Sequence, residues 1–346
     1  MEFESVLGKS RYTVAWIIQK LKESDEKFRI LESKNKILKI EETNLSGIGY
    51  MSFIIRLTFY FGNNDNNEER NDKTFKVICK IPTTDMIYKN FKRSSENNHS
   101  KNGTNHNKKS NELKEFLTKA HNRECFVYSS IVSNLGIKVP KIYFFEEKND
   151  ERERDGCIVM EDISEKGALQ NVLKEINYQQ VEAVIKSIAK MHAKSQTLPQ
   201  KFFQNLKFDN IIKVPKDCLK GITKLESKII QKYKIELEEI WEQEEEIVDS
   251  HLKYGIPSVV SHGDCWINNI FFYKNESGKA SNEFYTLLDW QLTHRGNGLN
   301  DIARFLTVSV EAEMLEKHRS DFLQIYYKSF NEKCLYIFMK TYIYKK

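Results

Sequence analysis

Residues 259–273 read Val-Val-Ser-His-Gly-Asp-Cys-Trp-Ile-Asn-Asn-Ile-Phe-Phe-Tyr, and they decide how the rest of the chain is interpreted. A polar stretch follows at 275–278, and residues 284–291 then read Phe-Tyr-Thr-Leu-Leu-Asp-Trp-Gln. Two short runs of β-branched and aromatic residues on either side of a turn predict a β-hairpin. The His-Gly-Asp triplet at 262–264 would lie in the loop that enters the hairpin, and Asp289 would lie where the chain leaves it.

The polar side chains at this hairpin suit metal-assisted phosphoryl transfer. Asp264 would accept a hydrogen bond from a substrate hydroxyl, and Asn269 follows it by five residues. The amide oxygen of Asn269 and the carboxylate of Asp289 are hard ligands, which suit Mg²⁺ rather than zinc. Any single Asp in a turn is most often only a turn residue, so the prediction depends on the ordered set.

The ordered set resembles the kinase-like small-molecule phosphotransferases, which include the aminoglycoside phosphotransferases, the choline/ethanolamine kinases and the ecdysteroid-kinase-like family. The residues at 262–269, 288–291 and 301–306 are most similar to the ecdysteroid-kinase-like branch, over about residues 30–330. The resemblance implies an α+β, bilobal protein-kinase-like fold. Its N-lobe would hold a small antiparallel sheet, and its C-lobe would be mainly helical.

In the N-lobe, which the resemblance assigns to residues 1–162, the glycines Gly47 and Gly49 lie between two predicted strands. A backbone without side chains there would approach nucleotide phosphates closely, with Ser52 completing a Gly-x-Gly-x-x-Ser pattern. Taken alone, this pattern is weak, and an ordinary hairpin turn is the better explanation. Lys80 on the next predicted strand matches the phosphate-binding lysine of kinases.

Two acidic residues complete the predicted nucleotide site. Glu124, on a helix predicted over Leu113 to Val132, matches the family residue that pairs with the strand lysine. Glu161, at the acidic end of the strand predicted from Cys157 to Ile163, resembles the inter-lobe linker where backbone groups meet adenine. For a Lys on a strand or a Glu on a helix, a solvated position is the ordinary alternative.

The C-lobe, residues 163–346, would contain the catalytic loop at 259–273. His262 is expected to stabilise this loop by hydrogen bonds rather than to transfer protons, and Asp301 is expected to brace it. His192 lies on an apolar helical face, where a structural role is favoured. The residues after Asp289 are Trp and Gln, where protein kinases have Phe and Gly, which favours the small-molecule branch. The run Cys-Leu-Tyr-Ile-Phe at 334–338 is unlike the usual family continuation, so the C-lobe is expected to be shortened, which puts acceptor binding in doubt.

A stretch rich in Lys, Asn and Ser, at about residues 90–112, is predicted to be a disordered basic insertion because it has too few apolar side chains to offset its ordering entropy. A nucleic-acid-binding arm is a sharper but less favoured interpretation. Residues 12–22 predict an amphipathic helix, for which packing against the protein is favoured over a membrane surface.

Composition limits the classes of function. A chain of 346 residues with 40% hydrophobic residues suits two lobes, and 54 basic against 49 acidic residues do not predict nucleic-acid binding. The six cysteines have no CxxC spacing, which favours reduced thiols. The N-terminal residues lack the apolar run of a secretory signal, and no stretch approaches the length of a membrane span. These features predict a cytoplasmic protein.

The sequence therefore predicts an ATP- and Mg²⁺-dependent phosphotransferase. Its partner would be a small-molecule hydroxyl acceptor, such as an ecdysteroid-like sterol or a xenobiotic. A choline/ethanolamine-type kinase is the alternative enzyme, and it would need an acidic, aromatic-lined pocket for a quaternary ammonium. A truncated, catalytically inactive nucleotide-binding paralogue is the alternative of another class.

Overall fold

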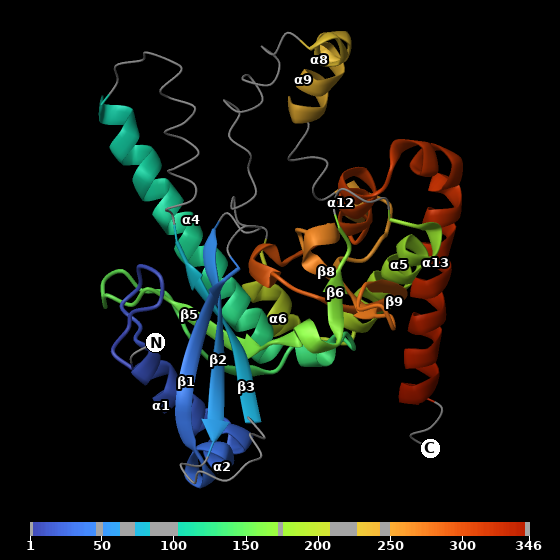
Figure 1. Cartoon of the computed structure of the whole chain (residues 1–346). Helices are drawn as coiled ribbons and strands as arrows, with labels where there is room; N and C mark the ends of the chain where they lie inside the picture. Colours follow the sequence, from blue (N-terminus) through green and yellow to red (C-terminus); the bar gives the residue numbers. More distant parts are fainter. Residues whose placement is uncertain are drawn as a thin grey trace. The chain divides into compact units, whose positions relative to one another are not determined.

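The computed structural model of the protein describes residues 3–45, 51–62, 73–83, 103–171, 176–207, 227–242 and 250–342. The chain divides into two units (Figure 1). The first comprises residues 1–129 and 139–167, and the second comprises residues 130–138 and 168–346. Within the described ranges, no helix is both long enough and apolar enough to cross a membrane.

A five-stranded antiparallel sheet forms the centre of the first unit, in the order β1-β2-β3-β5-β4. Alternate side chains of its second strand, at Ile55, Leu57, Phe59 and Phe61, are buried, as the period of a half-buried strand requires. The strands are β1 (Lys36–Asn44), β2 (Ser52–Gly62), β3 (Lys73–Pro82), β4 (Ile142–Glu146) and β5 (Cys157–Glu161).

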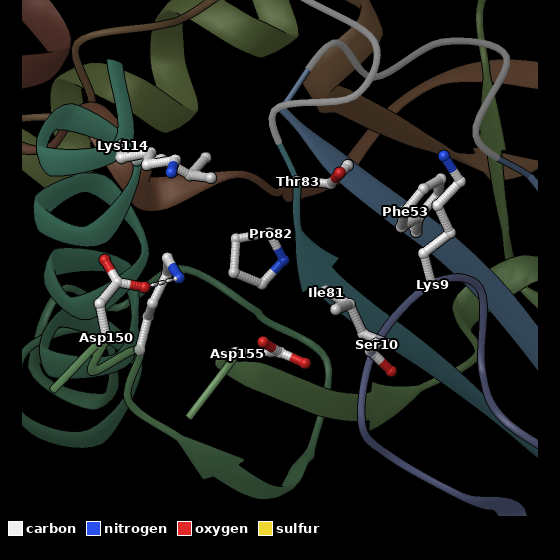
Figure 2. Close-up of a pocket in the computed structure, with 11 residues that line it drawn as sticks. Lys9, Ser10, Phe53, Ile81, Pro82, Thr83, Lys114, Asp150 and Asp155 are labelled. Carbon is white, nitrogen blue, oxygen red and sulfur yellow. Dashed lines mark hydrogen bonds and ion pairs between the residues drawn. The ribbon is translucent and has the colours of Figure 1, made fainter. Parts of the chain in front are cut away.

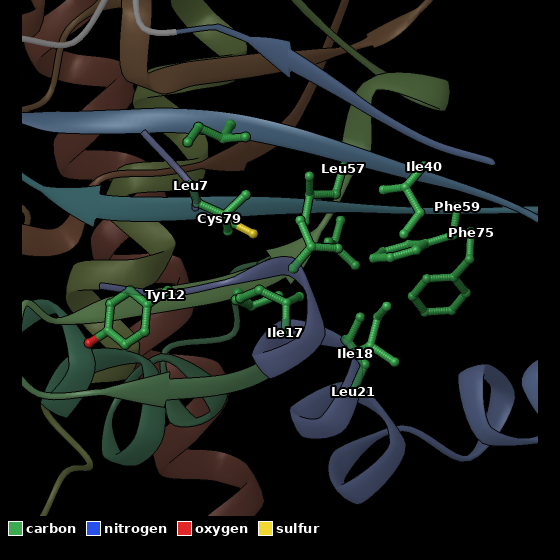
Figure 3. Packing of buried hydrophobic residues seen from close by; sticks show 14 of the residues in the cluster. Leu7, Tyr12, Ile17, Ile18, Leu21, Ile40, Leu57, Phe59, Phe75 and Cys79 are labelled. Carbon is green, nitrogen blue, oxygen red and sulfur yellow. The ribbon is translucent and has the colours of Figure 1, made fainter. Parts of the chain in front are cut away.

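Two short helices, α1 (Val14–Ser24) and α2 (Glu26–Lys34), cover one face of this sheet. Ile17 and Leu21 of α1 are fully buried in the same cluster as the sheet residues (Figure 3). Phe28 of α2 meets three phenylalanines of the sheet edge to face, with ring centroids 5.1 to 5.7 Å apart. The amphipathic helix predicted at 12–22 is therefore a packing helix, as expected.

The long helix α4 (Gly103–Ser130) begins ten residues before its predicted start. Residues 103–112, predicted to belong to a disordered insertion, form its first turns, whereas 90–102 lie outside the described residues. Each residue added to an existing helix gains a backbone hydrogen bond, so a polar segment can extend a helix that is anchored further along by Leu117, Ala120 and Val127. Composition alone does not show this anchoring.

The second unit is mainly helical, with two small sheets beside its helices. The larger sheet has the order β6-β8-β9, and the smaller pairs β7 with β10. The helix α5 starts with a capping box between Asn177 and Gln180, and α5 packs against α13. The helices are α5 (Tyr178–Ser195), α6 (Gln200–Asn205), α8 (Lys228–Lys232), α9 (Lys234–Glu242), α11 (Ser250–Lys253), α12 (Leu299–Ser309) and α13 (Ala312–Tyr342). The strands are β6 (Gly167–Leu169), β7 (Val259–Ser261), β8 (Ile270–Lys274), β9 (Ala280–Leu287) and β10 (His294–Gly296).

Residues 130–138 belong to the second unit, although their place in the sequence suggested the first lobe. The hydroxyl of Thr286 on β9 donates to the carbonyl of Lys138 at 2.6 Å. The ammonium of Lys138 lies 5.5 Å from the ring centre of Tyr273 and 5.0 Å from that of Tyr285. Cation–π contacts and a hydrogen bond thus hold this segment on the hairpin. The predicted α+β class, with an antiparallel first sheet and a mainly helical second part, is confirmed.

Candidate functional site

The predicted hairpin is present, with Ile270 of β8 opposite Leu287 of β9. The loop at 262–264 follows β7 and turns sharply at Gly263, whose φ is +86°. A Cβ atom at this position would lie 2.2 Å from the carbonyl oxygen of Leu292, so a side chain cannot fit. The glycine of the His-Gly-Asp triplet is therefore required by both its backbone conformation and a close backbone contact.

Asp301, at the first turn of α12, holds the loop by its backbone. Its carboxylate accepts hydrogen bonds from the N–H groups of His262 at 2.7 Å and Gly263 at 2.9 Å, and from Nε2 of His192 at 3.0 Å. Asp301 is 1% exposed. Burial alone would raise its pKa, but the hydrogen bond and charge of His192 and the other donors outweigh burial, so the pKa of Asp301 is lowered. The bracing role expected for Asp301 is present in the geometry.

His262 is fully buried and satisfied at both ring nitrogens. Its Nε2 donates to the carbonyl of Leu288 at 2.9 Å, and its Nδ1 accepts from the backbone N–H of Asp264 at 3.3 Å. The ring also meets Trp290 edge to face at 4.8 Å. Burial lowers the pKa of His262, although the carboxylates around it, Asp301 foremost, raise it. A neutral ring joining the two ends of the hairpin fits the expected loop-stabilising role.

Asp264 and Asn269 are joined directly. The amide nitrogen of Asn269 donates to the backbone carbonyl of Asp264 at 2.9 Å and to its Oδ2 at 3.2 Å. The other carboxylate oxygen, Oδ1, lies 3.0 Å from the guanidinium of Arg304. Because Nδ2 of Asn269 is committed to Asp264, Oδ1 is the atom with which Asn269 would bind a cation.

Asp289 lies in a strained backbone conformation at the exit of the hairpin. Its φ of 68° and ψ of 64° are left-handed, a region that residues other than glycine rarely adopt. Its Oδ2 accepts a hydrogen bond from the side chain of Gln291 at 3.2 Å. Since Leu288 N–H bonds the carbonyl of Asn269 at 2.9 Å, Asn269 and Asp289 lie at the same end of the hairpin.

The donor atoms fit the predicted magnesium ion. Mg²⁺ is usually held by one or two carboxylates together with waters and substrate phosphates, rather than by an all-protein cage. One amide oxygen and one carboxylate at one end of a hairpin are such a set. In the part of the chain that the structure describes, no group of three or more His, Cys, Asp or Glu side chains is arranged to hold a metal ion.

In the first unit, the expected pair of Lys80 on β3 and Glu124 on α4 is formed. The ammonium nitrogen lies 2.5 Å from Oε2 of Glu124, and the two side chains are 9% and 1% exposed. Charges this deeply buried require a partner, because their desolvation is otherwise uncompensated. The solvated position that an isolated Lys or Glu usually takes is therefore not adopted at either residue.

The structure describes two of the four remaining predicted nucleotide-binding residues. Ser52 is buried at the start of β2, opposite Pro82. Glu161 ends β5, and its carboxylate accepts a hydrogen bond from the backbone N–H of Lys141 at 3.1 Å. Gly47 and Gly49 lie outside the described residues. The roles assigned to these four residues stay predictions.

The first unit contains a hollow of about 370 Å³ (Figure 2), and none of the predicted site residues that the structure describes is among its lining residues. Its apolar part is formed by side chains of β2, β3 and α4, and its rim carries three lysines and two aspartates. Both aspartates are engaged: Asp150 pairs with Lys148, and Asp155 accepts from the backbone N–H of Arg11. The lining residues are Lys9, Ser10, Phe53, Ile81, Pro82, Thr83, Lys114, Leu117, Lys148, Asp150 and Asp155.

Three residues around the loop were given no role by the sequence. Arg304 reaches Asp264 from α12, and the hydroxyl of Ser309 accepts from the N–H of Ile267 at 2.9 Å. Tyr326 of α13 bonds Nδ1 of His192 at 3.0 Å. Arg304 stands in the 301–306 run that carried the resemblance, three residues after Asp301, and this helical spacing was the available signal.

The sequence profile of the ecdysteroid kinase-like family matches residues 46–337, which is most of the chain. This chain belongs to the ecdysteroid kinase-like family. The predicted family is confirmed. The residues that carried the resemblance, at 262–269, 288–291 and 301–306, all lie inside the matched range.

A curated relative of this ecdysteroid kinase-like chain comes from Caenorhabditis elegans and is named "Uncharacterized oxidoreductase dhs-27". The two are 25% identical over 345 residues, which cover 95% of this chain and 38% of the relative. The chain thus spans about two fifths of the length of that protein.

Solved structures similar to the ecdysteroid kinase-like chain include aminoglycoside phosphotransferases. The GDP and kanamycin complex of APH(2")-IIia has a TM-score of 0.48 at 11% identity and covers 87% of this chain and 80% of its own. The streptomycin-ATP-APH(2")-IIa ternary complex has a TM-score of 0.41 at 15% identity, with coverages of 87% and 85%. Likeness at this level says nothing of activity.

Proposed function

We propose that this chain is an ATP- and Mg²⁺-dependent phosphotransferase that phosphorylates a hydroxyl group of a small molecule. The observation that carries the proposal is the arrangement of Asp264, Asn269 and Asp289 at one end of the β8–β9 hairpin. The buried Asp301 holds the backbone of the loop that leads to Asp264. Membership of the ecdysteroid kinase-like family supports the same class of reaction. An ecdysteroid-like sterol or a hydroxylated xenobiotic is the proposed acceptor.

Asp264 is proposed to orient the attacking hydroxyl. Phosphoryl transfer requires little covalent chemistry from the protein, so positioning and charge stabilisation account for most of the rate. The carboxylate of Asp264 is 17% exposed, which leaves it accessible to an acceptor while its backbone is fixed through the loop. An O–H of the acceptor would donate to this carboxylate, which aligns the oxygen lone pair for attack on the terminal phosphate.

The other polar residues are proposed to hold the nucleotide. Asn269 and Asp289 would bind Mg²⁺, which neutralises developing phosphate charge when it is present. Lys80, oriented by Glu124, would contact nucleotide phosphates, as Gly47, Gly49 and Ser52 would from the backbone side. Glu161 would mark the segment whose backbone meets adenine. The presence of Asp264, Asn269 and Asp289 together speaks against an inactive paralogue.

A thermal-shift measurement with Mg²⁺-ATP tests the proposal. A ligand that binds only the folded state raises the melting temperature by mass action, by about 2.7 kcal/mol of apparent stability at a hundredfold excess over Kd. We expect a shift in the wild type that Asp289→Ala loses. Asp321→Ala, which removes an exposed carboxylate from α13, is the matched control and should keep the shift. A folded wild type without any shift would overturn the proposal.

A further inference from the structure

The half-exposed guanidinium of Arg304 stands beside the carboxylate that we propose to meet the acceptor. Its Nη2 lies 3.0 Å from Oδ1 of Asp264, and its side chain is 47% exposed. The other oxygen of Asp264 accepts from the neutral amide of Asn269. The charge of this carboxylate is therefore balanced by a cation that belongs to the protein.

The position of Arg304 is fixed by the helix that carries it. Asp301, one helical turn earlier, binds the loop backbone through two hydrogen bonds, and Ser309 accepts from Ile267 further along the same helix. Ile302, Phe305 and Leu306 bury the opposite side of α12. Both ends of α12 are thus bonded to the loop. A shift of the whole helix that moved Arg304 away from Asp264 would break these buried hydrogen bonds.

A fixed cation at this place selects among acceptors by charge. A sterol or other uncharged alcohol meets Asp264 without repulsion, and the guanidinium still has N–H groups to donate to its oxygens. An amino-alcohol would bring a second positive charge close to Arg304, and its ammonium would find the carboxylate already neutralised. A choline-type acceptor requires acidic surroundings, and at Asp264 the negative charge is neutralised by Arg304.

We infer that Arg304 is a positioning and specificity-determining residue that directs the site to uncharged or anionic hydroxyl acceptors and disfavours cationic amino-alcohols. The inference rests on the proposed phosphotransferase function and narrows its substrate class. Arg304 acts through Asp264 and through its own charge, and takes no part in the transfer of the phosphoryl group.

The test compares two pairs of alcohols that differ chiefly in charge. Choline and its uncharged isostere 3,3-dimethylbutan-1-ol form the small pair, and a polyhydroxylated sterol and its amine-substituted analogue form the large pair. ADP formation above the acceptor-free rate is measured with Mg²⁺-ATP for the wild type, Arg304→Gln and Arg304→Lys. The wild type should use the uncharged member of a pair better, and Arg304→Gln should raise the cation-to-neutral ratio of kcat/KM by at least about tenfold. Arg304→Lys should keep the wild-type preference.

The ratio of kcat/KM for the two alcohols of a pair separates a charge effect from general damage. Loss of structure would lower kcat/KM for both alcohols alike. A wild type that prefers choline or the aminosterol, or an unchanged ratio in Arg304→Gln, would overturn the inference while leaving the phosphotransferase proposal intact. If no alcohol of either pair raises ADP formation, the inference also fails. The nucleotide-dependent thermal shift then decides the proposed function separately.

Discussion

The carboxylate of Asp264 is held by Asn269 and Arg304, so a substitution that keeps its size tests the carboxylate itself. Replacing Asp264 by Asn keeps the size of the side chain but removes the carboxylate to which the substrate hydroxyl would donate its proton. We expect Asp264→Asn to lower turnover by about 10²- to 10⁴-fold, the usual contribution of a positioned acid–base group. ATP affinity, measured by titration calorimetry, should change little.

The matched control is Asp155→Asn, the same chemical change at a carboxylate that binds the backbone of Arg11 in the first unit. It should leave turnover within about twofold of the wild type, because surface changes away from a site are usually small in effect. Full activity in Asp264→Asn would remove this residue from the proposed mechanism.

The backbone of Asp289 gives a prediction that concerns stability rather than activity. Its left-handed conformation costs a residue with a Cβ about 1–2 kcal/mol, which glycine does not lose. Asp289→Gly and Asp289→Ala both remove the carboxylate. We expect the free energy of unfolding, from urea titration, to be about 1 kcal/mol higher for Asp289→Gly than for Asp289→Ala. Equal values, or a more stable alanine variant, would show that this strain is relieved elsewhere.

At the scale of elements, Asp25 joins two helices of the first unit to a strand. Its Oδ1 caps α2 by accepting from the N–H of Phe28 at 2.7 Å, and its Oδ2 lies 2.5 Å from the ammonium of Lys141 just before β4. Asp25 itself is 3% exposed. Asp25→Ala should therefore lower the free energy of unfolding by about 2 kcal/mol, mainly through the lost cap.

Asp25→Asn separates the two contributions, since an amide oxygen still caps the helix while the ion pair with Lys141 is lost. Because Lys141 is 55% exposed, its pair with Asp25 is screened by solvent and should contribute less than the cap. We expect Asp25→Asn to lose less than half as much stability as Asp25→Ala in the same denaturation experiment. A larger loss from Asn than from Ala would contradict this assignment.

At the scale of the whole molecule, buried neutral histidines make the fold sensitive to acid. Burial lowers the pKa of His121 to about 4. The Nε2 atom of this buried ring lies 2.9 Å from the carbonyl oxygen of Glu146. An unfolded histidine titrates near 6.5, so between these values the unfolded chain binds a proton that the folded chain does not. The free energy of unfolding therefore falls as the pH falls from about 6.5 towards 4, by up to about 3 kcal/mol.

His262, in the second unit, also has a lowered pKa and acts in the same direction. The lowered pKa of Asp301 has its effect only at lower pH, because its stabilisation is lost as the pH falls below the ordinary range of a carboxyl. Urea unfolding should give a lower free energy of unfolding at pH 5 than at pH 7. His121→Gln, which keeps an N–H donor but does not titrate, should reduce this difference between the two pH values. An unchanged pH dependence in this variant would contradict the role of His121.

Sequence alone determined the hairpin after the His-Gly-Asp triplet, because local periodicity and turn residues record it. An ordered set of chemically demanding residues carried the resemblance to the ecdysteroid-kinase-like family. That resemblance implied the α+β class and the pair of Lys80 with Glu124, and with it came the expectation that Asp301 would brace the loop.

Only the tertiary structure decided which partners the polar residues find. The pairing of Arg304 with Asp264, the contact of Tyr326 with His192, and the attachment of 130–138 to the hairpin join residues that lie 40, 134 and up to 148 positions apart. A hydrogen bond or an ion pair depends on distances of about 3 Å, and helix packing and chain reversals set such distances between segments that show no common pattern in the sequence. The early start of α4 likewise depends on burial further along the same helix, which its polar first turns do not reveal.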